Sequence, residues 1–150
     1  MNEFYRRYFG IVEGIIPVGR NKQALGYDKV LIKDNGHEVK LEEKRDTHKT
    51  GNMAIETWSV VDATTHERIK PGWIYTSHAD YIAYCFDPSY EVYMLPFEQL
   101  QHVWRENQDE WITRHRERPV KNGAEYYTLI VPVPIPKLLG ALKMALIGDA

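Results

Sequence analysis

Residues 28–44 read DKVLIKDNGHEVKLEEK, and this stretch decides the predicted fold. Two runs with alternating apolar residues flank Asp34-Asn35-Gly36. Asn-Gly between such runs is the strongest short signal for a β-hairpin, because both residues tolerate positive φ. We therefore predict one strand over residues 27–33 and its return over residues 37–44. In such a hairpin, paired residues have numbers that sum to about 71.

The returning strand carries its charged residues in alternation with apolar ones. Successive side chains of a strand point to opposite faces of the sheet. Val39 and Leu41 are therefore expected to face the core, with Glu42 and Lys44 on the other face. Asp28, near the start of the first strand, falls close to residues 42–44 across the hairpin. The sequence thus predicts that Asp28, Glu42 and Lys44 converge.

Two carboxylates and one lysine suit magnesium-dependent cleavage of a phosphodiester bond. Magnesium prefers oxygen ligands and keeps several waters. It polarises a phosphate and lowers the pKa of a bound water. Neighbouring carboxylates favour the charged form of a lysine, so we assign Lys44 as a charge stabiliser, with a base as the alternative role. A solvated hairpin face with cross-strand charge pairs is the competing interpretation.

The remaining pattern predicts helices outside a single mixed sheet. The predicted elements are a helix over 2–16, a loop over 46–51, a third strand over 52–58, an irregular connection over 59–78, strands over 80–86 and 91–95, a helix over 96–115, an edge strand over 126–133 and a short helix over 137–147. We expect one α/β domain over residues 1–150, with a core over 2–131 and a C-terminal tail over 132–150.

Composition excludes several classes of protein. The 150 residues carry 19 Lys+Arg against 21 Asp+Glu, a formal net charge of -2, which rules out bulk electrostatic coating of nucleic acid. The single cysteine, Cys85, follows an apolar run and is expected to be buried. No segment approaches the roughly 20 apolar residues of a membrane span, and no signal peptide is evident. We therefore expect no membrane partner and a cytoplasmic location, in a bacterial host if the protein is phage-encoded.

Asp28, thirteen intervening residues and Glu42-Glu43-Lys44 form a D-x(n)-E-x-K pattern. Lys44-Arg45-Asp46 and then Thr50-Gly51-Asn52 with Glu56 continue it. Further along come Pro71-Gly72-Trp73, Thr76-Ser77 and Ala79-Asp80-Tyr81. This ordered set, over about residues 26–95, resembles small phage-type and bacterial nucleases of the PD-(D/E)xK superfamily, which include Holliday-junction resolvases. Tyr27 stands where the superfamily name has proline, and Glu43 where this group usually has an apolar residue.

The resemblance implies a restriction-endonuclease-like core and a Mg²⁺ or Mn²⁺ site. Asp28 and Glu42 would be metal ligands, with Glu43 contributing its carbonyl. The order of Glu42 and Glu43 leaves open which of the two is the carboxylate ligand. Lys44 would be the catalytic lysine, and Glu56 would complete the acidic cluster or hold a water.

Local basic and polar residues are the candidates for contacts with nucleic acid. One patch lies beside the predicted site and another near the end of the long helix: Lys40, Arg45, Lys49, Thr50 and Asn52 in the first, Arg114, Arg116 and Arg118 in the second. An ordinary turn at Thr50-Gly51-Asn52 and a solvated helix end at the arginines are the alternatives.

These observations predict a divalent-metal-dependent DNA endonuclease that is selective for junctions, flaps or ends. A non-catalytic nucleic-acid-binding or interaction module on the same fold is the alternative. An RNA substrate shares the same chemistry and stays open. A homodimer is compatible with paired cuts and with the apolar C-terminal tail.

Overall fold

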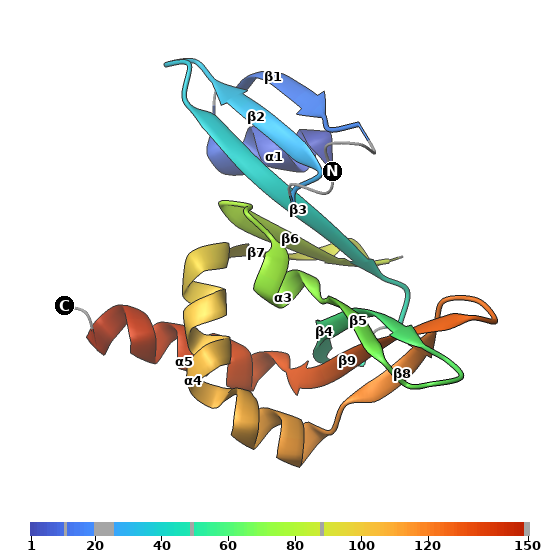
Figure 1. Cartoon of the computed structure of the whole chain (residues 1–150). Coiled ribbons are helices and arrows are strands. Elements are labelled where there is room, and N and C mark those ends of the chain that lie inside the picture. Colours follow the sequence, from blue (N-terminus) through green and yellow to red (C-terminus); the bar gives the residue numbers. More distant parts are fainter. Residues whose placement is uncertain (11, 20–25, 49, 88, 149–150) are drawn as a thin grey trace. The chain divides into compact units, whose positions relative to one another are not determined.

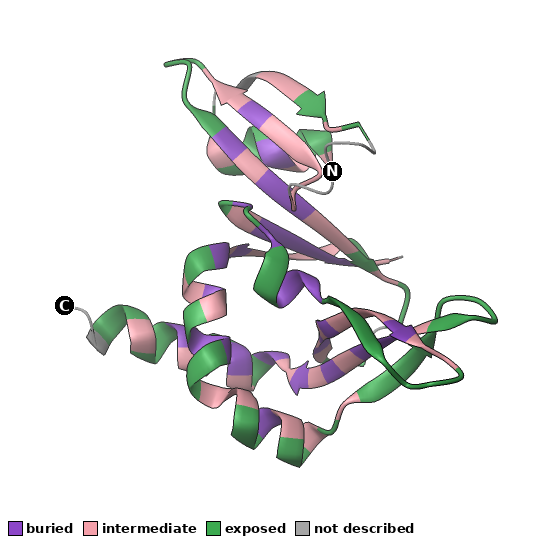
Figure 2. Ribbon diagram, viewed as in Figure 1, coloured by how far each residue is buried: buried purple, intermediate pink, exposed green. Residues whose placement is uncertain are grey.

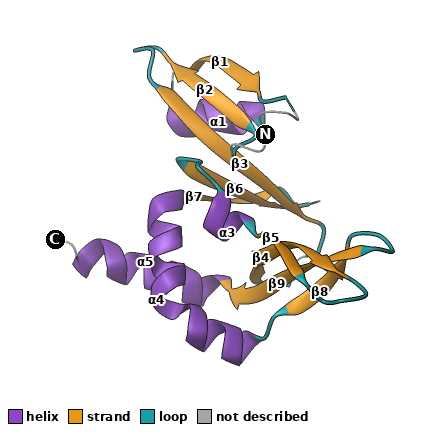
Figure 3. Cartoon of the chain, viewed as in Figure 1, coloured by secondary structure: helices purple, strands orange, loops and turns teal. Residues whose placement is uncertain are grey.

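The computed structural model describes residues 1–150 except 11, 20–25, 49, 88 and 149–150. The chain forms two compact units, each made of two segments. Residues 1–48 and 77–97 make the first unit, and residues 49–76 and 98–150 make the second. Both contain helices and strands, so the predicted α/β class is confirmed (Figure 3). The expectation of a single domain stays a prediction.

Among the described residues, the first unit consists of a mixed five-stranded sheet and the helix α1. Its elements are α1 (Asn2–Phe9), β1 (Val12–Pro17), β2 (Lys29–Lys33), β3 (Glu38–Asp46), β6 (Tyr81–Phe86) and β7 (Glu91–Pro96). The strand order is β1-β2-β3-β6-β7 (Figure 1). Only the β3–β6 pair is parallel, which requires a long crossover, and residues 47–80 provide it.

The predicted hairpin is present, with a turn of different geometry. β2 and β3 pair with Leu31 opposite Val39, so paired numbers sum to 70 against the expected value of about 71. Gly36 has φ of 78°, and its N–H donates to the Lys33 carbonyl. Asn35 keeps negative φ, and its side chain accepts the His37 N–H. This is a three-residue loop with a left-handed glycine rather than a two-residue Asn-Gly turn.

One face of the mixed sheet packs against α1. Tyr5, Leu31, Val39, Leu41 and Ala83 form a buried cluster there (Figure 2). Fully burying one such aliphatic side chain contributes about 1.5–3 kcal/mol. This packing fixes the faces of β3, because Val39 and Leu41 both point toward α1, as the alternation predicts.

The second unit contains an antiparallel four-stranded sheet in the order β5-β4-β9-β8, with three helices. Its elements are β4 (Asn52–Asp62), β5 (Arg68–Pro71), α3 (Trp73–Thr76), α4 (Phe97–His115), β8 (Arg118–Lys121), β9 (Tyr126–Pro134) and α5 (Ile135–Gly148). Trp104 and Trp111 of α4 are fully buried, as their helical spacing predicts. Within the described residues, no helix is long and apolar enough to cross a membrane.

The predicted helix over 2–16 is wrong beyond Phe9. Gly10 has φ of 76° and ends α1, and β1 follows and pairs with β2. Val12, Ile15 and Ile16 are β-branched, which favours a strand. Phe4, Tyr8, Ile11 and Ile15 gave a helical period only because two different elements adjoin at Gly10.

The third predicted strand does not join the mixed sheet. β4 pairs with β9 and β5, whereas the free edge of β3 is taken by β6. The irregular connection predicted over 59–78 is also wrong. β4 continues to Asp62, whose carboxylate caps the N–H groups of Thr64 and Thr65, and the chain returns as β5 before α3.

The C-terminal region is close to the prediction, with one strand added. β8 was not expected, and it pairs with residues 127–130 of β9. The predicted edge position of this strand is wrong, because β9 lies between β4 and β8. Pro132 pairs with Ala54 of β4 and lies beyond residues 127–130, which pair with β8, so its missing N–H interrupts no ladder with β8. The predicted helix over 137–147 is confirmed within α5, which begins with Ile135-Pro136, a position that suits proline.

Candidate metal and nuclease site

Glu42 is a charged side chain on the face of β3 that points away from α1, and it is nearly inaccessible. The residue is 7% exposed, and its Oε1 lies 2.6 Å from the Lys44 Nζ. Two residues along one strand share a face, which explains why Glu42 and Lys44 meet. Withdrawing a charge pair from water is costly, so such pairs contribute little to stability and invite a functional explanation.

Ser77 lies against the second oxygen of Glu42. Its Oγ is 3.5 Å from Glu42 Oε2, and 2.5 Å from the carbonyl oxygen of Gly26. A serine hydroxyl has a single proton, and the much shorter distance assigns it to Gly26. The Ala79 N–H donates to the same Oγ. The contact of Ser77 with Glu42 Oε2 is therefore long and weak, and this oxygen is the candidate for a metal ligand.

Asp28 lies just before β2 and takes part in three hydrogen bonds. Its N–H donates to the Leu41 carbonyl at 2.7 Å, and its own carbonyl accepts the Val18 N–H at 2.8 Å. Its side chain accepts the Glu43 N–H at 2.8 Å. The Asp28 carboxylate is therefore bonded to the peptide that follows Glu42. The structure places Asp28 beside the Glu42–Glu43 peptide and Lys44 beside Glu42. That the three side chains converge on one metal stays a prediction.

Glu43 points to the opposite face of β3. Its Oε1 accepts the Tyr5 hydroxyl at 2.6 Å and lies 2.7 Å from the Lys29 Nζ. Burial, together with the adjacent Glu43, raises the pKa of Tyr5 far above its ordinary value, so the hydroxyl stays a donor. Between the two adjacent glutamates, it is Glu42 whose carboxylate shares a face with Lys44. The Glu43 carbonyl as a ligand stays a prediction.

No protein-family model, curated protein or solved structure matches this chain. The function therefore has to be argued from the site itself.

The carboxylates predicted for the site are the kind of ligand that magnesium or manganese prefers. Among the described residues, no group of three or more His, Cys, Asp or Glu side chains is arranged to hold a metal, and a metal at this site stays a prediction. Magnesium is commonly bound through one or two carboxylates and completes its shell with water. Asp28 and Glu42 can supply those two carboxylates.

Glu56, the fourth predicted catalytic residue, belongs to the second unit. It lies in β4, where its Oε1 accepts the Trp73 N–H at 3.2 Å. Met53 and Ile55, on the other face of β4, are buried. Glu56 therefore has a local role at the start of α3, and its part in an acidic cluster stays a prediction.

The predicted nucleic-acid contacts divide between the two units. Lys40 and Arg45 are in the first, where Lys40 lies over the Tyr27 ring and Arg45 is 3.9 Å from Asp87. Lys49 is outside the described residues. Thr50 and Asn52 are in the second unit, where the Thr50 Oγ accepts the Asn52 N–H and the chain bends at left-handed Gly51. A contact of this segment with phosphate stays a prediction.

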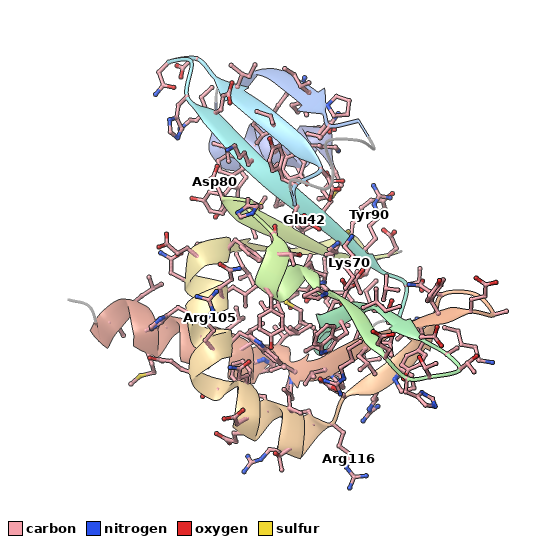
Figure 4. The ribbon with its side chains drawn as sticks, in the orientation of Figure 1. Glu42, Lys70, Asp80, Tyr90, Arg105 and Arg116 are labelled. Carbon is pink, nitrogen blue, oxygen red and sulfur yellow. The ribbon has the colours of Figure 1, made fainter. Side chains whose placement is uncertain are left out.

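The three arginines near the end of α4 are not equivalent. Arg114 lies in the last turn of α4, 3.8 Å from Glu110, which fits a solvated helix end. Arg116 follows the helix with φ of 63° and points away from the ribbon (Figure 4). Arg118 is exposed on β8, a strand rather than a helix end.

Sequence reasoning missed three participants in the site: Ser77, Tyr5 and Lys29. Ser77 lies in the segment before Asp80, which Figure 4 labels together with Glu42. The Thr76-Ser77 pair was part of the resemblance, but its contact with Gly26 depends on the crossover. Tyr5 had a signal only in its place among the apolar residues of the first helix, and Lys29 in its place beside Asp28.

Proposed function

We propose that this protein is a divalent-metal-dependent DNA endonuclease that hydrolyses phosphodiester bonds, with selectivity for branched or terminal DNA structures. The observation that carries the proposal is the state of Glu42. It is a nearly buried carboxylate with one oxygen paired to Lys44 and the other weakly contacted, at 3.5 Å, by the Ser77 hydroxyl. The Asp28 carboxylate is bonded to the next peptide along the strand.

The roles follow from the chemistry of these groups. Asp28 and Glu42 would hold Mg²⁺ or Mn²⁺, and the ion would supply positive charge beside the phosphate and lower the pKa of a bound water. Lys44 places its ammonium group beside the same carboxylate and stabilises the negative charge that develops on the phosphate. Ser77 and Gly26 pack the loop before Asp28 against Glu42, which keeps the two carboxylate-bearing segments together.

Exposed cations supply the contacts that a DNA backbone requires. Arg116 and Arg118 are exposed, and neither forms an ion pair within the described residues. A few such contacts can position DNA even though the whole chain has a net charge of -2. Paired cuts need two copies of the site, and the exposed Met144, Leu146 and Ile147 of α5 offer apolar surface for a homodimer.

The test is cleavage of supercoiled, four-way, flap and linear DNA with Mg²⁺ or Mn²⁺. Wild-type protein should cut at least one of these substrates, and EDTA should stop it. Glu42→Gln and Lys44→Ala should each lower the rate by about 100-fold or more. Glu38→Gln is the matched control, because Glu38 is an exposed acid on the same strand and the same face as Glu42, and it should cut normally.

Two outcomes contradict the proposal. One is that folded wild-type protein leaves every DNA substrate intact in Mn²⁺. The other is that Glu42→Gln cuts as well as wild type. DNA binding without cleavage would support the alternative, a non-catalytic nucleic-acid-binding module.

A further inference from the structure

Glu43 combines two sets of contacts that point in different directions. Its carboxylate is fixed on the α1 side of β3 by the Tyr5 hydroxyl and the Lys29 ammonium. Its main-chain N–H donates to the Asp28 carboxylate. One residue therefore connects the buried cluster under α1 with a proposed metal ligand.

The Glu43 carboxylate is fixed by two donors in a largely buried environment. Tyr5 is fully buried, and both donors converge on the same Glu43 oxygen. The Glu43 and Lys29 side chains are only 16% and 20% exposed. Lys29 also lies 5.6 Å from the Tyr5 ring centroid and bonds Asn2 of α1. Charge-assisted bonds in such a site are short and directional, so they restrict how the Glu43 residue can rotate or shift.

The main-chain N–H of Glu43 orients the Asp28 side chain. The backbone of Asp28 is fixed through Leu41 and Val18, but those bonds leave its χ1 angle free. Among the described residues, the Glu43 N–H is the one group seen to bond the Asp28 carboxylate. A shift of the Glu43 peptide would therefore turn the carboxylate. Hydrogen bonds from outside the ligand shell commonly orient metal-binding carboxylates in this way.

We infer that Glu43 is a positioning residue, which uses Tyr5 and Lys29 to hold the peptide that aims the Asp28 carboxylate at the divalent metal. This inference rests on the proposed metal site. It also accounts for a charged residue at a position where the family that the sequence resembles usually has an apolar one. The contact with α1 would otherwise be a structural link only.

Manganese alone is the probe that separates these two roles. The dissociation constant of Mn²⁺ is measured for the full chain by calorimetry, without DNA. Glu43→Gln keeps an acceptor for Tyr5 but removes the charge that pairs with Lys29, and Tyr5→Phe removes only the hydroxyl. Both substitutions preserve shape, and each should weaken Mn²⁺ binding by about 10-fold.

Val39→Ala is the matched control. Val39 is buried in the same cluster, on the same strand and face as Glu43, but its apolar side chain forms no hydrogen bond or ion pair. It should lower thermal stability while the Mn²⁺ dissociation constant stays within about twofold of wild type, because its loss is one of packing.

The outcomes are distinct. Wild-type binding together with unchanged affinity in Glu43→Gln and Tyr5→Phe would overturn the positioning role and leave the metal site intact. Equal weakening in Val39→Ala would also overturn it, because general loosening would explain the effect. Absence of Mn²⁺ binding to folded wild type would overturn the metal site and, with it, the positioning role.

Discussion

Gly72 lies where the backbone at the end of β5 passes directly over β4, and replacing it with alanine should be strongly destabilising. A Cβ at this position would lie 2.8 Å from the Thr57 carbonyl carbon and closer still to the Glu56 carbonyl, nearer than the 3.0 Å that real Cβ atoms keep. The Gly72 N–H donates to the Thr57 carbonyl at 2.8 Å, so the chain cannot simply move away.

The expected cost of Gly72→Ala follows from these contacts. Overpacking typically costs 1–3 kcal/mol, and we expect about 3 kcal/mol because the obstacles are backbone atoms rather than flexible side chains. For a chain of this size, that corresponds to a melting temperature lower by roughly 6–12 °C. Thermal and urea unfolding followed by circular dichroism measure the loss.

A second glycine provides the control. Gly140 is in α5, where an added Cβ meets nothing within 4 Å. Gly140→Ala should be neutral or stabilising by about 0.5–1 kcal/mol, because alanine loses less conformational freedom in a helix. The reasoning is refuted if Gly72→Ala unfolds within about 0.5 kcal/mol of wild type, a change typical of a surface site without strain.

Two further predictions concern titratable groups. Burial, and then the nearby Lys137 and Arg114, lower the pKa of His115, so its NMR titration should have a midpoint below 6.5. As the pH falls, the unfolded chain therefore binds this proton before the folded chain does. The stability contributed by neutral His115 is complete above pH 6.5 and decreases as the pH falls through the folded pKa. His115→Gln should remove this pH dependence of stability, and an NMR midpoint at or above 6.5 would contradict the prediction. Burial and Asp87 raise the pKa of the Cys85 thiol, which is 1% exposed, so a thiol reagent should modify it only after unfolding in guanidinium; full labelling of native protein would contradict this.

Features that depend on neighbours in sequence could be predicted well. The β2–β3 hairpin, the faces of β3 and the long helix α4 all rest on local signals, namely a turn sequence and a period of two or 3.6 residues. The position of Asp28 beside the Glu42–Glu43 peptide follows from the hairpin alone. It therefore needed no knowledge of distant contacts.

Features that depend on pairing between distant segments could not be predicted. The sequence of residues 52–58 indicates a strand, but nothing local says whether its partner is β3 or a segment more than seventy residues later. Asn52 pairs with Pro134, and this pairing creates a second sheet. Glu56 lies in the second unit, and its part in the acidic cluster stays a prediction. The order of strands in a sheet is decided by burial over the whole chain, not by strand propensity.

The choice between Glu42 and Glu43 depends both on the local alternation along β3 and on contacts with other elements. Alternation along β3 places Glu42 with Lys44 and Glu43 with Leu41, which by itself would leave a carboxylate facing a hydrophobic cluster. An unpaired charge there would be too costly to keep. Lys29 supplies the opposite charge. It lies on β2 and pairs with Leu41 of β3, so it is diagonally opposite Glu43 on the same face of the sheet, where cross-strand charges attract. Tyr5 then completes the set from α1. A glutamate that looks like a misplaced charge in the sequence is thus explained by its partners, and the same partners leave Glu42 as the carboxylate for the proposed metal.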